Sequence, residues 1–65
     1  MRASGNMNLR SEPNLDGRVL SVVMKGEYAD YLEESSVDNR GVRWYLVNYR
    51  GLTGWVSSTY AVLEY

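Results

Sequence analysis

The stretch that decides the fold is residues 44–56, which read Trp44-Tyr45-Leu46-Val47-Asn48-Tyr49-Arg50-Gly51-Leu52-Thr53-Gly54-Trp55-Val56. Two runs rich in aromatic and β-branched residues flank the dipeptide Arg50-Gly51, and its glycine tolerates positive φ. Two strand-like runs separated by a two-residue turn that ends in Gly predict a β-hairpin.

Side-chain alternation in this hairpin assigns its two faces. If Val47 and Val56 face the core, then Trp44 and Trp55 lie on outward faces. An exposed indole stacks well on peptide planes and sugar faces, so both tryptophans are candidate ligand-binding residues. Each could instead cover the sheet edge or pack under a loop. Leu46 shares the face of Trp44, and together they could form an apolar patch for self-association or for packing on a parent domain.

The rest of the chain adds short strands and no helix, because no stretch keeps a 3.6-residue periodicity over ten or more residues. Apolar–polar alternation and β-rich runs predict further strands over residues 6–10, 19–23, 28–33 and 60–64. Several short strands in so small a chain indicate an all-β fold, either a compact barrel or a pair of packed sheets.

The connections between these strands differ in character. Residues 11–17 are dense in turn formers and predict a shaped loop, whereas residues 24–27 predict a tight turn. The polar residues 33–43 predict a long, mobile loop. Residues 57–59 predict a single helical or 3-10 turn before the last strand. Residues 1–5 are small or polar and predict a disordered tail or the end of a linker, which leaves one domain over residues 6–65.

Composition excludes many classes of function. The chain has 65 residues with no His and no Cys, which removes the common nucleophile–base pairs and the usual zinc ligands, so we expect no enzyme, no metal and no cofactor. A net charge of −1 with scattered arginines argues against nucleic acid as a partner. The apolar runs are too short to cross a membrane. No apolar run follows the first residues, so export would depend on another part of a longer chain or on cell lysis.

Polar residues near the predicted loops supply further candidates. Asn8 and Arg10 share the outward face of the first strand and could meet ligand carbonyls or brace the neighbouring loop, and we favour bracing. The carboxylates of the two loops could present negative potential that attracts an ammonium group, or could simply be solvated. These carboxylates are Glu12, Asp16, Glu33, Glu34 and Asp38.

Three pieces of the chain, in this order, resemble the bacterial SH3 (SH3b) family. They are Asn8-Leu9-Arg10-Ser11-Glu12-Pro13, Lys25-Gly26, and the block from Trp44 to Tyr60. The resemblance implies a small SH3-like five-stranded barrel of two packed antiparallel sheets, with a short 3-10 turn before the last strand. It also implies that Trp44 and Tyr60 line a ligand groove, beside which we place Trp55, Asn8, Arg10, Glu12, Glu34 and Asp38.

Similarity to this family implies a binding role at the bacterial cell wall. Such domains resemble the targeting modules of autolysins and phage endolysins, which direct a linked hydrolase to peptidoglycan through stem peptides or cross-bridges. The expected location is the cell wall or the extracellular space, as part of a larger or lysis-released protein. Two alternatives remain. One is a module that takes an extended protein segment, although Ser57 stands where such domains commonly have a groove proline. The other is a structural domain that packs on its parent enzyme.

Overall fold

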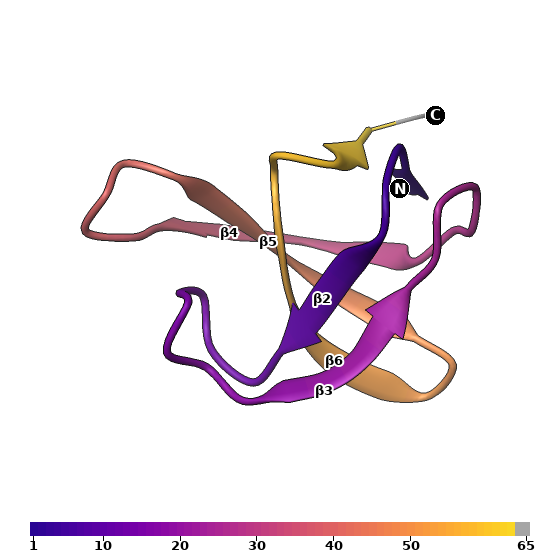
Figure 1. The fold of residues 1–65 in the computed structure, drawn as a ribbon, viewed down its shortest axis with the longest axis horizontal. Helices are drawn as coiled ribbons and strands as arrows, with labels where there is room; N and C mark the ends of the chain where they lie inside the picture. Colours follow the sequence, from indigo (N-terminus) through magenta and orange to yellow (C-terminus); the bar gives the residue numbers. More distant parts are fainter. Residues whose placement is uncertain (64–65) are drawn as a thin grey trace.

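The computed structural model describes residues 1–63 and shows an all-β chain with no helix in that range (Figure 1). The strands are β1 (Arg2–Ala3), β2 (Met7–Arg10), β3 (Val19–Val23), β4 (Asp30–Val37), β5 (Arg43–Tyr49), β6 (Leu52–Ser57) and β7 (Ala61–Val62). They form a five-stranded antiparallel sheet in the order β3-β2-β6-β5-β4 and a two-stranded sheet of β1 and β7. In residues 1–63 no ladder joins β3 to β4, so both remain edge strands.

The predicted hairpin is confirmed as the centre of the larger sheet. β5 and β6 pair without interruption from Trp44 opposite Ser57 to Tyr49 opposite Leu52. Arg50 and Gly51 both take positive φ, 51° and 82°, as a two-residue turn matched to the strand twist requires.

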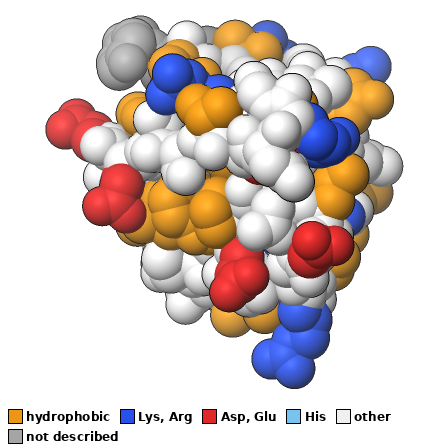
Figure 2. Space-filling model, turned by 90° about the vertical axis from the view of Figure 1, so that its left-hand side faces the viewer, with side chains coloured by type: hydrophobic (Ala, Val, Ile, Leu, Met, Phe, Trp, Pro, Cys, Tyr) orange, Lys and Arg blue, Asp and Glu red, His pale blue; other side chains and the backbone are white. Residues whose placement is uncertain are grey.

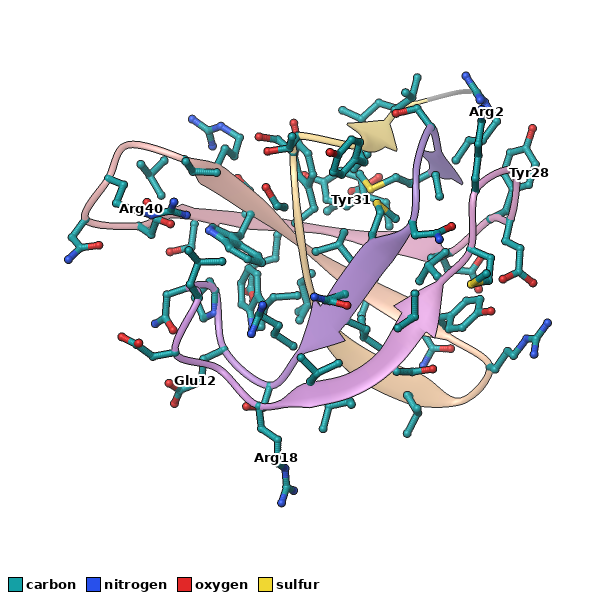
Figure 3. The ribbon with its side chains drawn as sticks, in the orientation of Figure 1. Arg2, Glu12, Arg18, Tyr28, Tyr31 and Arg40 are labelled. Atoms are coloured by element: carbon teal, nitrogen blue, oxygen red, sulfur yellow. The ribbon has the colours of Figure 1, made fainter. Side chains whose placement is uncertain are left out.

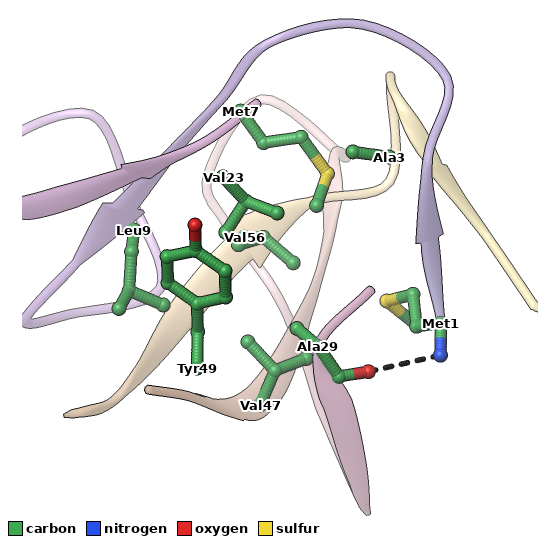
Figure 4. Packing of buried hydrophobic residues seen from close by; sticks show 9 residues of the cluster. All are labelled: Met1, Ala3, Met7, Leu9, Val23, Ala29, Val47, Tyr49 and Val56. Atoms are coloured by element: carbon green, nitrogen blue, oxygen red, sulfur yellow. Dashed lines mark hydrogen bonds between the residues drawn. The ribbon is translucent and has the colours of Figure 1, made fainter. Parts of the chain in front are cut away.

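The core lies where the alternation of the hairpin predicts it. Val47 and Val56 have no exposed surface, and Tyr49 packs beside them with 5% of its surface exposed (Figure 4). Tyr31 and Tyr45 pack against this cluster, and their two rings meet edge to face with centroids 5.4 Å apart. Tyr28 is 60% exposed, which fits the expectation that Tyr28 and Tyr31 do not both face the core.

Residues 1–5 do not form the frayed tail that their composition suggested. Ala3 is completely buried, and the Met1 amine donates a 2.9 Å hydrogen bond to the Ala29 carbonyl (Figure 4). The Ala29 N–H in turn donates to the Met1 carbonyl oxygen. Ser4 donates both its N–H and its hydroxyl to the Tyr60 carbonyl. Local composition does not predict this order, because the pairing partners of residues 1–5 lie far along the chain.

The long mobile loop predicted over residues 33–43 is also wrong. β4 continues to Val37, where it pairs with Arg43, and only residues 38–42 form the connection to β5. A bulge interrupts the register between Tyr31 and Ser35, and Glu33 takes a φ of 59° there. An edge strand with exposed faces can be polar throughout, so low apolar content did not exclude a strand.

The connection before β7 is a simple turn over residues 58–60, not the 3-10 turn expected from the sequence. The Ser58 N–H donates to the Arg43 carbonyl, and the Thr59 N–H donates to the Ser57 hydroxyl. The side-chain hydroxyl takes the place of a backbone acceptor and sets the path of the chain.

Gly54 marks a close approach between β6 and β2. A Cβ at this buried glycine would lie 2.8 Å from the Arg10 carbonyl oxygen and 3.0 Å from the Leu9 side chain. We expect Gly54→Ala to lower the free energy of unfolding by about 1–3 kcal/mol, the usual cost of overpacking. Urea unfolding measures this. Gly26→Ala is the control, since a Cβ there meets no atom within 4 Å and adds only backbone strain. Equal stability of Gly54→Ala and wild type would contradict the close approach.

Candidate functional site

A pocket of about 250 Å³ opens where β2, the β5–β6 hairpin and three connecting segments meet. It is lined by Asn6, Met7, Asn8, Arg10, Leu15, Arg40, Trp44, Ser57, Thr59 and Tyr60. The loop between β2 and β3 and the turn between β4 and β5 lie at the same end of the molecule (Figure 1). Figure 2 faces this end and shows hydrophobic side chains exposed between separate basic and acidic groups.

Asp38 organises the turn between β4 and β5. Its Oδ1 accepts hydrogen bonds from the backbone N–H groups of Arg40 and Val42, at 2.8 and 3.0 Å. Its Oδ2 accepts from the Trp44 Nε1–H at 2.9 Å and from Arg40 Nη2 at 3.1 Å. The Asp38 side chain is only 1% exposed, so its carboxylate serves the turn and does not face the solvent.

These hydrogen bonds change the acidity of Asp38. The bond from Trp44 is the main cause that lowers the pKa of the carboxyl group from 3.8 to about 2, helped by the backbone N–H groups of Val42 and Arg40 and by the Arg40 side chain. Burial acts in the opposite direction but is outweighed. Asp38 is therefore ionised at neutral pH and holds the Trp44 indole in one orientation.

Trp44 does not present the exposed platform expected from strand alternation. The alternation itself is correct, because Trp44 lies outside the central core cluster to which Val47 belongs. However, Trp44 is only 1% exposed, since the turn organised by Asp38 covers it, and the indole lies beneath the pocket. A buried Trp44 also cannot form the exposed apolar patch predicted with Leu46, which is itself half-buried.

Arg10 braces the loop that follows β2, as the sequence suggested. Its Nη1 donates to the carbonyl oxygens of Leu15 and Gly17, at 3.2 and 2.9 Å. Asn8, on the same face of β2, is exposed and lines the pocket with Arg10. Arg10 thus fixes the loop that carries Leu15, another lining residue.

Tyr60 is the exposed aromatic residue of the pocket, with half of its surface accessible. Its carbonyl is held by Ser4, and its ring lies against Gly5, where a Cβ would approach the ring to 2.8 Å. Residues 1–5, which the sequence pattern excluded from the domain, therefore position this side chain.

Four predicted candidates lie outside the pocket lining, and one of them is Asp38, whose covered carboxylate holds the turn beside the pocket. Glu12 and Glu34 are exposed, and Trp55 is half-buried and lies between Arg10 and Leu46 in the sheet register. Because none of the described Asp and Glu residues lines the pocket, the structure does not assemble the acidic wall expected from the two loops.

The pocket also contains residues that sequence reasoning did not select. These are Asn6, Met7, Leu15, Arg40, Ser57 and Thr59. Arg40 had a usable signal, because an Asp followed three residues later by Gly is typical of a tight turn, and a turn at 38–41 would have placed Arg40 near Trp44. The other residues are brought together only by long-range strand pairing.

The fold and the pocket define a small all-β binding domain. The chain belongs to the bacterial SH3 domain family, whose model matches residues 5–61. Members of this family are binding modules, generally non-catalytic and often part of cell-wall or extracellular proteins. No curated protein and no solved structure matched the chain. Within residues 1–63 no helix has the length and hydrophobicity needed to cross a membrane.

Proposed function

We propose that this domain binds peptide elements of peptidoglycan in the pocket between β2 and the β4–β5 turn. Through this binding it directs a linked hydrolase to the bacterial wall. The domain would then act outside the cell, as part of a larger or lysis-released protein. A modest affinity, on the order of micromolar, is sufficient for such a role because a polymer offers many copies of the same ligand.

One observation carries the proposal: the pocket combines a half-exposed aromatic residue with fixed polar groups. Tyr60 offers a ring on which a peptide plane can lie, and Asn8 is an exposed amide on the same pocket. Arg10 and Asp38 hold the two loops in place through side-chain hydrogen bonds. A site already ordered before binding loses little entropy when it takes a ligand.

The test is sedimentation of the domain with purified peptidoglycan, comparing wild type with Tyr60→Ala. We expect the wild type to pellet with the wall and Tyr60→Ala to bind about tenfold more weakly, since an aromatic residue at a binding site commonly contributes more than 1 kcal/mol. The stability of the variant should change little, because the side chain is half exposed.

Tyr28→Ala is the matched control, because Tyr28 is also an exposed tyrosine but lies at the other end of the molecule from Arg40 and Glu12 (Figure 3). It should bind the wall as the wild type does. If folded wild-type protein stays in the supernatant with several wall types, the proposal fails, and a protein partner becomes the leading alternative. Equal losses in Tyr28→Ala and Tyr60→Ala would place binding outside this pocket.

A further inference from the structure

The ionisable side chains that line the pocket are basic or phenolic. Arg10 and Arg40 line it, and no Asp or Glu among residues 1–63 does, although the whole chain has a net charge of −1. The nearest carboxylate in the hydrogen-bond network is Asp38, which is covered and bonded to Arg40. The pocket is thus a locally cationic site in a slightly acidic domain.

Arg10 is held in place with part of its donor capacity unused. Only Nη1 is bonded, to two carbonyls of the 11–18 loop, and carbonyls leave its positive charge uncompensated. Within residues 1–63 its Nη2 and Nε atoms have no hydrogen-bond acceptor and no carboxylate partner. A guanidinium fixed by one nitrogen presents the others in a rigid, planar arrangement.

Arg40 also lines the pocket, and unlike Arg10 it is paired with a carboxylate. Its Nη2 bonds to Asp38, but the side chain remains 50% exposed. Figure 3 shows Arg40 directed from the β4–β5 turn toward the body of the molecule, whereas Arg18 extends into solvent. The bond to Asp38 holds the Arg40 side chain beside the pocket and neutralises part of its charge.

We infer that the pocket recognises a peptide carboxylate through Arg10 and Arg40, with Tyr60 against the adjoining peptide. This reverses the expectation that acidic loops attract an ammonium group. A carboxylate fits better than a phosphate because Asp38 offsets one of the two cations, which leaves about a single positive charge for the ligand. Guanidinium groups bind carboxylates with two parallel hydrogen bonds, so the terminal carboxylate of a wall stem peptide is the group we assign. The inference deepens the proposed function and rests on it for the source of that peptide.

The experiment compares two synthetic peptides, L-alanyl-D-isoglutaminyl-L-lysyl-D-alanine, in which the C-terminal carboxylate is the only carboxylate, and the same peptide as its C-terminal amide. Binding to the isolated 65-residue chain is followed by NMR, with the Trp44 indole N–H resonance as a reporter beneath the pocket. We expect amidation to weaken binding about tenfold, the usual scale for a charge-assisted hydrogen bond. Arg40→Gln should cost a similar factor and remove the preference for the free acid.

Arg18→Gln is the matched control, since it removes the same charge from an exposed arginine that does not line the pocket. It should bind both peptides as the wild type does. The inference would be overturned if the acid and the amide bound equally well, if Arg40→Gln kept the preference for the acid, or if inorganic phosphate occupied the pocket and the peptide acid did not. Wall sedimentation could still succeed in each of these cases. If the domain preferred the acid of an unrelated peptide to its amide and did not sediment with the wall, the carboxylate site would be supported and wall targeting refuted.

Discussion

Trp44→Ala should remove a third or more of the free energy of unfolding of the domain at 25 °C. Removing a buried Trp commonly costs about 3–5 kcal/mol, because transfer free energy is lost and a cavity remains. A chain of 65 residues has a total stability of roughly 3–10 kcal/mol. Trp44 is 1% exposed and also holds Asp38 through its Nε1–H, so its loss removes the cover of the β4–β5 turn as well. Urea unfolding monitored by circular dichroism measures the effect.

Trp44→Phe separates the two contributions of this side chain. Phe fills most of the space but cannot donate to Asp38 Oδ2, which then keeps only the Arg40 side chain as its partner. We expect a folded variant of intermediate stability, with the backbone signals of residues 38–42 shifted. If Trp44→Ala unfolds at the wild-type urea concentration, the buried position of this indole is wrong. Trp44→Ala is therefore a poor probe of ligand binding, and Tyr60→Ala is the better one.

The parts of the fold that the sequence predicted are those determined locally. The β5–β6 hairpin depends on alternation within about six residues and on a two-residue turn, both visible in the chain. The same alternation assigned Val47, Val56 and Gly54 to the buried side. Arg10 was correctly read as a brace because a turn-rich loop follows it directly in sequence.

The parts that were missed depend on distant partners. Residues 1–3 are held in place because Met1 hydrogen-bonds to Ala29 and β1 pairs with β7. No local sequence pattern indicates such pairing. The polar half of β4 is a strand because β5 hydrogen-bonds to it, and hydrophobicity is a poor guide to an edge strand. Trp44 was assigned to the correct face, but its burial depends on the turn that covers it.

The pocket, like the missed elements, depends on contacts between segments that are distant in sequence. It is made where the β4–β5 turn, the 11–18 loop and the 57–60 turn converge, and each is held by a side chain that hydrogen-bonds to backbone: Asp38, Arg10 and Ser57. These three residues are polar, so composition alone marks them as solvated loop residues. Their side-chain hydrogen bonds fix the three connecting segments, and these segments position the residues that line the pocket.

Asp38→Asn should disorder the β4–β5 turn more than any substitution of an exposed carboxylate. Oδ1 of an asparagine can still accept from the backbone of Arg40 and Val42, as Asp38 Oδ1 does. The amide nitrogen would then face two donors, the Trp44 Nε1–H and Arg40 Nη2, and turning the amide round only moves the conflict to the backbone. A buried indole N–H without an acceptor is costly, so the unfolding midpoint should fall. Glu34→Gln is the control, because Glu34 is an exposed carboxylate outside the pocket.

The pH dependence of stability gives the same prediction a second readout. Because the pKa of Asp38 is lowered from 3.8 to about 2 in the folded state, the carboxylate stabilises the fold fully above pH 3.8. This contribution is lost as the pH falls through the interval down to about 2. Glu27 also has a lowered pKa, chiefly through its hydrogen bond from Tyr49, so the wild-type curve contains more than one group. The difference between wild type and Asp38→Asn isolates Asp38, and it should shrink as the solution is acidified through this interval. The Trp44 indole N–H resonance should move over the same pH interval, because its acceptor is the Asp38 carboxylate. If the stability difference between wild type and Asp38→Asn stayed constant from neutral pH to pH 2, Asp38 would not hold the turn through its charge.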